Sequence, residues 1–191
     1  MINFDERFTD HISVIEDSRS LIPKIEQVVT RIYDSVQRGG KVLWIGNGGS
    51  ASEAQHLSTE LIGHLIADRQ AIASIALTTD TSALTAIGND FGFDEIFARQ
   101  IQGLCNAGDV VIGLSTSGES VNVVKGLQAA SEKGAVVVGL TGIKGGSVCE
   151  VSDVCISVPS NDTQRIQEIH LLIGHLICEK VEQTMLTVWS D

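Results

Sequence analysis

The chain has 191 residues, with 13 Lys and Arg against 24 Asp and Glu, which gives a formal net charge of −11. An acidic surface of this kind disfavours general binding to nucleic acids or to anionic membranes. Hydrophobic residues make up 43% of the sequence and charged residues 19%. This balance is typical of a globular domain and excludes a largely disordered chain.

The sequence favours an intracellular setting. No apolar stretch approaches the roughly 18 residues that a transmembrane helix needs. Asp5 and Glu6 stand where a signal peptide would carry Lys and an apolar run. We therefore expect a cytoplasmic protein that does not bind membranes. In that compartment we expect the four cysteines, none in a Cys-x-x-Cys pair, to be reduced and buried; they are Cys105, Cys149, Cys155 and Cys178.

Two helices are predicted at the start of the chain. Residues 4–18 form the first, and Pro23 begins a second one that runs to about Gln37, because Pro is well placed in a first helical turn. Together they form an N-terminal helical extension over residues 1–38. With a long C-terminal helix predicted at about 164–187, they are the natural candidates for an oligomer interface.

The remaining core, residues 39–191, alternates between strands and helices. The predicted strands are the short β-branched runs 41–46, 71–77, 109–114, 135–140 and 153–158. The helical segments between them lie within 46–65, 78–88, 93–104, 121–134 and 144–151, and Asp80 or a nearby Thr is expected to cap the second of them. This order indicates a single α/β domain over residues 1–191, with a doubly wound, five-stranded parallel sheet between two helical layers.

Two loops at strand ends are candidate ligand loops. Gly46–Ser50 follows the first strand and precedes a helix; it lacks the Lys of a P-loop and by itself also fits a plain tight turn. Ser115–Ser120 follows the third strand and carries four hydroxyls, more than the one that helix capping by Ser117 or Ser120 would need. If the strand order is 2-1-3-4-5, both loops meet at the crevice where such sheets bind ligands.

Two helices carry candidate ligands for a metal or for proton transfer. His56 and Glu60 share one helical face at spacing i,i+4, which also fits a surface ion pair. On the C-terminal helix, Gln167 and His175 are about 12 Å apart along the axis, so one metal that touches both would strain a single helix. We therefore expect more than one chain to build the site, although His residues in apolar helices are often core residues.

Taken together, these segments resemble the sugar isomerase (SIS) family and, within it, the phosphoheptose isomerases. The matching pieces span about residues 40–180 and are GNGGSASEAQH, ELIG, AIGNDFGF, GLSTSGES, LTGIKGG and RIQEIH with the later His175. The resemblance implies conversion of D-sedoheptulose 7-phosphate to D-glycero-D-manno-heptose 7-phosphate, the first step toward ADP-heptose and the lipopolysaccharide core. It also implies a homotetramer with active sites between subunits.

The resemblance also implies roles for individual residues. Glu60 and His175 would be the acid/base pair, and one zinc per subunit would be bound by His56, Glu60, Gln167 and His175. The substrate-binding residues would be Asn47, Gly48, Gly49, Glu60, Asn89, Asp90, Ser115, Thr116, Ser117, Ser120 and Gln167, with the four hydroxyl residues on the phosphate. His64 is a departure, because the family often has Arg there.

The residue types suit an aldose–ketose isomerase. Such an enzyme moves a proton between C1 and C2 through a cis-enediol. A partly buried carboxylate such as Glu60 is a suitable base for a C–H, and an imidazole such as His175 can serve the neighbouring oxygens. Bound zinc can polarise the carbonyl.

Two alternatives remain from the sequence. One is a SIS-domain regulatory protein that binds a replication initiator; such a relative keeps the GNG and RIQE segments but lacks the carboxylate and imidazole that Glu60 and His175 supply here. The other is an isomerase of a different sugar phosphate, such as a pentose phosphate, because sequence physics does not fix the length of the sugar.

Overall fold

Five short parallel strands form one sheet in the order β2-β1-β3-β4-β5, which confirms the assumed order. The computed structural model describes residues 2–189, with side chains up to residue 187. The strands are β1 (Val42–Gly46), β2 (Ser74–Ala76), β3 (Val110–Ser115), β4 (Val136–Thr141) and β5 (Val154–Ser157). In the register of the central pairs, Trp44 lies beside Ala76 of β2 and Ile112 of β3.

Side chains of the central strands alternate between two apolar cores. Val42 and Trp44 of β1 lie in one core, and Leu43 and Ile45 lie in the other. All four are fully buried. Successive residues of a strand point to opposite faces, so the near-continuous apolar run of β1 is explained by helices on both sides of the sheet.

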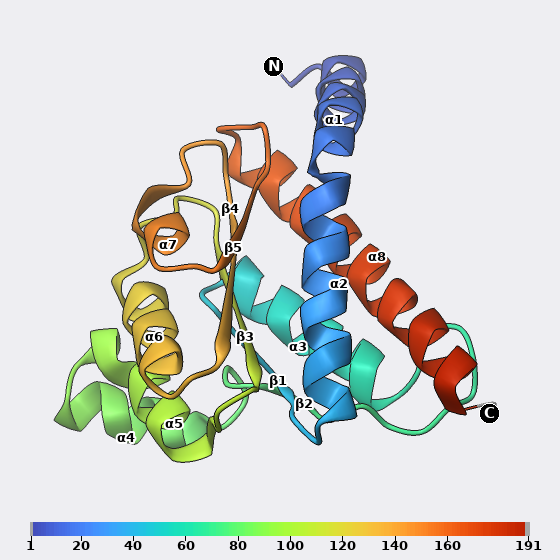
Figure 1. Ribbon diagram of the computed structural model, residues 1–191. Helices are drawn as coiled ribbons and strands as arrows, with labels where there is room; N and C mark the ends of the chain where they lie inside the picture. The colour runs from blue at the N-terminus through green and yellow to red at the C-terminus, as the bar shows by residue number, and fades with distance from the viewer. Residues whose placement is uncertain (1, 190–191) are drawn as a thin grey trace.

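Helices cover the two faces of the sheet (Figure 1). One face carries α2 (Ile22–Gln37), α3 (Gly49–Ile62) and α8 (Thr163–Trp189), and the other carries α5 (Ile96–Leu104), α6 (Val121–Glu132) and α7 (Gly146–Glu150). The outer elements are α4 (Thr81–Asp90), which packs on α5 and the turn η2 (Phe93–Glu95), and α1 (Phe4–Ser18), joined to α2 by η1 (Arg19–Leu21). Within residues 2–189, no helix is long and apolar enough to cross a membrane.

Local signals place most helix ends where the sequence predicts them. Asn3 caps α1 by accepting the backbone N–H of Asp5 at 3.1 Å, and Asp80 caps α4 by accepting that of Ala83 at 2.9 Å. Pro23 lies in the first turn of α2. The clearest difference is β2, which has three residues instead of the predicted seven, because it is an edge strand that pairs only with β1.

Helices α3 and α8 lie against each other along much of α3, and this contact positions the candidate site. Leu57 of α3 sits so close to Gly174 of α8 that a Cβ on Gly174 would overlap the Leu57 side chain. Farther along, the Cys178 thiol donates to the carbonyl of Leu57 at 3.7 Å. The glycine therefore lets the backbones approach closely enough for side chains on the two helices to meet.

Candidate active site

The glycine loop between β1 and α3 is tied to the helix that follows β3. Gly48 has a φ of 56°, a left-handed conformation that glycine adopts without strain. The amide of Asn47 donates to Asn122 Oδ1 at 2.7 Å, and the amide of Asn122 donates back to Asn47 Oδ1 at 2.9 Å. The loops after strands β1 and β3 therefore meet, as the strand order predicts. Asn122 was not predicted from the sequence, although a polar residue in the apolar first turn of α6 is a signal for it.

The hydroxyl loop, residues 115–120, gathers its serines around one point. Ser115 Oγ lies 2.9 Å from Ser120 Oγ and 3.4 Å from Ser117 Oγ, and Ser117 Oγ accepts the N–H of Glu119 at 3.1 Å. Ser120 ends the loop at the N-terminus of α6, where its side chain makes no capping hydrogen bond. Ser120 is thus not used to cap the helix, and the loop holds several hydroxyl donors close together for an anion.

His56, Glu60 and His175 converge on one point between α3 and α8. His56 Nε2 is 3.2 Å from Glu60 Oε1 and 2.8 Å from His175 Nε2. One ligand atom from each residue lies within 4.8 Å of the other two. The carboxylate of Glu60 is largely buried, with 15% of its side chain exposed, whereas His56 is 49% exposed. The cluster therefore faces solvent through His56, and one chain supplies all three groups.

An ion pair that sequence analysis missed holds the α3 end that carries Glu60. The guanidinium of Arg69 donates to the backbone carbonyl of Glu60 at 2.7 Å and to that of Leu61 at 2.8 Å. Its Nε donates to Glu182 of α8 at 2.9 Å, and both side chains are buried. We call this pair, Arg69 and Glu182, the helix clamp.

The Glu182 end of the helix clamp also binds backbone. Its carboxylate accepts the N–H groups of Leu65, Ile66 and Ala67, each at 2.9 Å. Burial by itself raises the pKa of Glu182, but these three N–H groups and Arg69 outweigh it and hold the pKa below its usual value. The loop after α3, which includes the exposed His64, is therefore fastened to α8.

Gln167 lies near the glycine loop. Its side-chain amide rests against Gly49 and occupies the space that a Cβ there would need. Along α8, Gln167 lies eight residues before His175, which is about 12 Å along the helix axis. A role of Gln167 as a fourth metal ligand stays a prediction.

Asn89 and Asp90 lie apart from the other predicted residues. They end α4, where the amide of Asn89 donates to Asp90 Oδ1 at 2.8 Å, and both side chains are exposed. Helix α4 packs on α5 and η2, on the face of the sheet opposite α8 (Figure 1). Among the described residues, no hydrogen bond or ion pair joins Asn89 or Asp90 to His56, Glu60 or His175.

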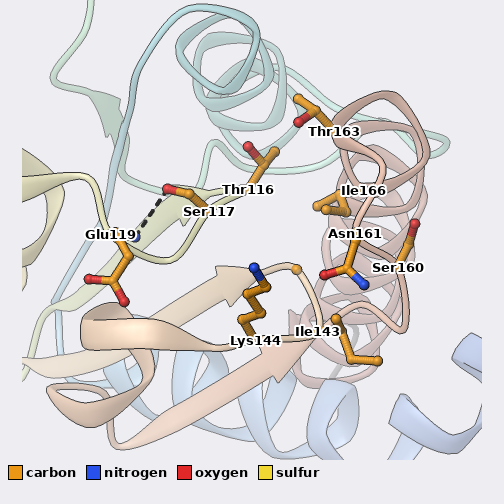
Figure 2. Close-up of a pocket in the computed structure, with 10 residues that line it drawn as sticks. Thr116, Ser117, Glu119, Ile143, Lys144, Ser160, Asn161, Thr163 and Ile166 are labelled. Carbon is orange, nitrogen blue, oxygen red and sulfur yellow. Dashed lines mark hydrogen bonds between the residues drawn. The ribbon is translucent and has the colours of Figure 1, made fainter.

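A pocket of about 340 Å³ opens beside the hydroxyl loop (Figure 2). Most of its lining residues have polar side chains, and they come from the loops after β3, β4 and β5 and from the first turn of α8: Thr116, Ser117, Glu119, Gly142, Ile143, Lys144, Ser160, Asn161, Thr163 and Ile166. These loops follow the carboxyl ends of neighbouring parallel strands, where α/β sheets bind ligands. Thr116 and Ser117 belong both to the hydroxyl loop and to this pocket.

Glu53 is a buried carboxyl on α3 that sequence analysis also missed. Burial raises its pKa to about 7, against a hydrogen bond with Ser50 that lowers it. Its Oε2 atom has no hydrogen-bond partner among the described residues. Helical periodicity gives a signal for it, because Glu53 shares the buried face of α3 with Leu57 and Leu61.

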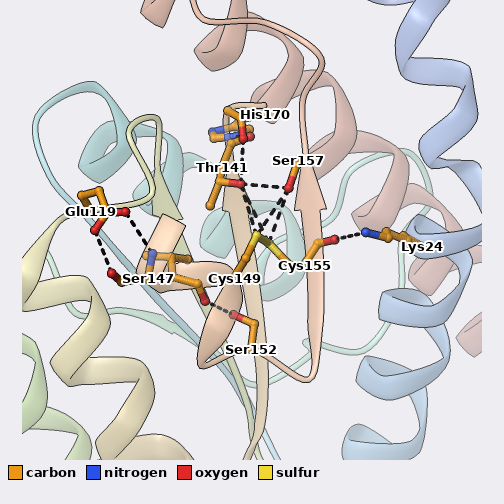
Figure 3. The surroundings of a disulfide bond; sticks show 11 residues. Lys24, Glu119, Thr141, Ser147, Cys149, Ser152, Cys155, Ser157 and His170 are labelled. Carbon is orange, nitrogen blue, oxygen red and sulfur yellow. Dashed lines mark hydrogen bonds between the residues drawn. A yellow bond between two sulfur atoms is a disulfide. The ribbon is translucent and has the colours of Figure 1, made fainter. Parts of the chain in front are cut away.

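The prediction of four reduced cysteines is wrong for one pair. Cys149 of α7 and Cys155 of β5 form a disulfide, with their Cα atoms 5.2 Å apart (Figure 3). The turn between α7 and β5 brings the two residues to a separation that a disulfide can span, which spacing in the sequence does not reveal. Cys105 and Cys178 are free and buried, as expected.

Comparisons with known proteins agree on one family. Residues 4–142 match the family model described as the SIS domain. The phosphoheptose isomerase of Geotalea daltonii is 50% identical over 176 residues, which cover 92% of this chain and 92% of that protein. The one of Aneurinibacillus thermoaerophilus is 50% identical over 165 residues, covering 86% of this chain and 83% of that protein.

Solved structures give the same result. The phosphoheptose isomerase of Neisseria gonorrhoeae matches with a TM-score of 0.89 at 40% identity and covers 95% of this chain and 100% of that one. The phosphoheptose isomerase of Francisella tularensis matches with a TM-score of 0.91 at 35% identity and covers 94% of this chain and 96% of that one.

Proposed function

Because the chain belongs to the phosphoheptose isomerases, a family of SIS-domain proteins, we propose that it converts D-sedoheptulose 7-phosphate to D-glycero-D-manno-heptose 7-phosphate. The observation that carries the proposal is the cluster of His56, Glu60 and His175 between α3 and α8. In the same chain, the glycine loop after β1 is hydrogen-bonded to the helix that follows the hydroxyl loop. In this role the enzyme supplies the first step toward ADP-heptose and the lipopolysaccharide core.

The proposed chemistry divides the proton transfers between two residues. Glu60 takes the proton from C1 of the ketose, which gives a cis-enediol, and then delivers a proton to C2. Its largely buried side chain limits hydration of the carboxylate, which suits a base for a C–H. His175 moves the proton between the two neighbouring oxygens, since an imidazole can both donate and accept near neutral pH.

We propose that the cluster binds one zinc per subunit. Two imidazole nitrogens and a carboxylate oxygen within 4.8 Å of one another are a donor set that suits this metal. His56, Glu60 and His175 would hold it, with Gln167 as the fourth ligand. When bound, zinc polarises the sugar carbonyl and stabilises negative charge on its oxygen. Glu60 can serve as ligand and base because a carboxylate has two oxygens.

The two ligand loops suit the rest of the substrate. The hydroxyls of Ser115, Thr116, Ser117 and Ser120 are proposed to bind the phosphate at the N-terminus of α6, where the helix dipole favours an anion. Asn47, Gly48, Gly49 and Gln167 are proposed to line the sugar, because the amide of Gln167 already rests on the glycine loop.

We propose a homotetramer whose active sites are completed by neighbouring copies. On α8, Ile169, Ile173 and Ile177 are buried by the chain itself, but Leu172 is 39% exposed and Leu176 is 43% exposed. These two leucines lie one turn apart and form an apolar stripe close to His175. A neighbouring copy that covers α8 could also bring its own Asn89 and Asp90, which lie away from the cluster in the same chain.

Product analysis tests the proposed reaction. Purified protein incubated with sedoheptulose 7-phosphate is expected to give the manno-heptose 7-phosphate, identified by NMR, whereas a pentose 5-phosphate should not react. Turnover of the pentose phosphate alone would favour the alternative that the protein is an isomerase of a different sugar phosphate. No turnover of either sugar, together with binding to a replication initiator, would favour the regulatory alternative, which the adjacent Glu60 and His175 disfavour. A cytoplasmic location and the absence of nucleic-acid binding also stay proposals.

A further inference from the structure

Lys144 is the one cation among the ten residues that line the pocket beside the hydroxyl loop. It lies in the loop between β4 and α7, and its ammonium points into the space between Thr116 and Ser117 on one side and Asn161 on the other (Figure 2). The side chain is exposed. In a chain with a net charge of −11, this places a local positive charge beside the loop proposed to bind phosphate.

The ammonium of Lys144 has no partner of its own. Among the described residues it makes no hydrogen bond or ion pair. Four other lysines each donate to a carboxylate or a carbonyl; they are Lys24, Lys41, Lys125 and Lys133. The acidic residue of the pocket, Glu119, is occupied elsewhere, because its carboxylate accepts the Oγ–H of Ser147 at 2.7 Å and the N–H of Ser147 at 3.2 Å. Lys144 is therefore available to a ligand.

Backbone hydrogen bonds fix the loop of Lys144 relative to the loops around it. The N–H of Gly142 donates to Thr116 O at 3.1 Å, and the N–H of Ile143 donates to Ser160 O at 3.1 Å. On the far side, the N–H of Val148 donates to Gly118 O at 2.9 Å. The lysine thus stands on a backbone anchored both to the hydroxyl loop and to the loop that leads into α8.

We propose that Lys144 is a phosphate-binding residue that completes the hydroxyl loop and sets the preference for phosphorylated sugars. Hydroxyls and amides of Thr116, Ser117 and Asn161 offer neutral hydrogen bonds around the pocket, whereas the ammonium adds a charge-assisted one, which is about twice as strong. This adds a cation to an anion site that the sequence predicts to work through hydroxyls alone. The identity of the phosphorylated sugar rests on the proposed function, but the binding of phosphate does not.

The test compares Lys144→Gln and Lys144→Arg with the matched control Lys133→Gln. Lys133 is an exposed lysine at the end of α6 that donates to the carbonyl of Gln102 on α5. Inorganic phosphate is titrated into each full-length protein by calorimetry, and kcat and KM are measured with sedoheptulose 7-phosphate. In Lys144→Gln, the dissociation constant for phosphate and the KM should both rise about tenfold, as expected for loss of a hydrogen bond to a charged group, while kcat changes less than about twofold.

The controls separate this role from a structural one. Lys144→Arg keeps the charge and should stay close to the parent protein, as should Lys133→Gln. Added salt should raise the KM of the parent protein more than that of Lys144→Gln, because screening acts on the charge that the variant lacks. Phosphate binding and KM unchanged in Lys144→Gln, or no phosphate binding by the parent protein, would overturn the proposal. Phosphate binding that depends on Lys144 without any isomerisation would instead overturn the proposed function alone.

Discussion

Replacing Glu182 by Gln should destabilise the protein strongly, although the change removes only one charge. In the wild type, one carboxylate oxygen accepts from Ile66 and Ala67, and the other accepts from Leu65 and Arg69. A glutamine keeps one acceptor oxygen but turns an NH₂ group toward two of these donors. Two hydrogen bonds to a charged group, each worth about 1.5–3 kcal/mol, are lost. The buried cation of Arg69 is left unpaired, so the expected loss of unfolding free energy is about 3–5 kcal/mol.

Urea unfolding at one fixed protein concentration measures this loss, because the proposed assembly would make stability depend on concentration. The matched control is Glu179→Gln, the same change on α8 at a side chain that accepts a hydrogen bond from Gln183 at 3.1 Å and no other among the described residues, and it should cost less than about 1 kcal/mol. The folded pKa of Glu182 is lowered, so its contribution is present above the unfolded value of 4.5 and is lost as the pH falls below it. The gap between wild type and Glu182→Gln should therefore shrink in acid. If Glu182→Gln and Glu179→Gln had equal unfolding free energies at pH 7, the assigned role of the helix clamp would be refuted.

Three further predictions concern a buried acid, the metal and assembly. The folded pKa of Glu53 is raised to about 7, so its contribution to stability is full below pH 4.5 and is lost as the pH rises through about 7. Glu53→Gln should therefore gain up to about 3 kcal/mol of unfolding free energy at pH 8 and much less at pH 5, and an equal gain at both would contradict the burial argument. Elemental analysis of protein prepared without chelators should find about one zinc per chain; full activity in chelator with no bound metal would remove zinc from the account. Replacing Leu172 and Leu176 by Glu should split the proposed tetramer, as measured by sedimentation, and should lower turnover in parallel; an active monomer would show that neighbouring copies are not needed.

Much of the fold could be predicted because local signals and sheet topology agree. Pro23 and Asp80 mark helix starts that the structure confirms, and the five apolar runs alternate with helices in the order that gives a doubly wound sheet. The resemblance to the phosphoheptose isomerases is confirmed as well. The extent of β2 could not be predicted, because an apolar run does not show how many of its residues will find a partner strand.

The unpredicted parts of the site depend on contacts between distant segments. Arg69 and Glu182 are separated by 113 positions, and only the approach of α3 to α8 brings them together. The pairing of Asn47 with Asn122 similarly needs β1 and β3 to be neighbours. His56 and Glu60 could be grouped from their helical spacing, but their meeting with His175 followed from the family resemblance and not from periodicity.

Isomerisation in D₂O tests the central claim most directly, because it follows the proton that Glu60 is proposed to move. With sedoheptulose 7-phosphate as substrate, the parent protein should form manno-heptose 7-phosphate that carries deuterium at C2, as detected by NMR. Glu60→Gln, which should stay folded, is expected to lose about 10²–10⁴-fold of this rate. Conversion by Glu60→Gln at the parental rate would contradict proton transfer by Glu60. Product without deuterium at C2 would contradict exchange of the proton with solvent between its removal from C1 and the protonation of C2.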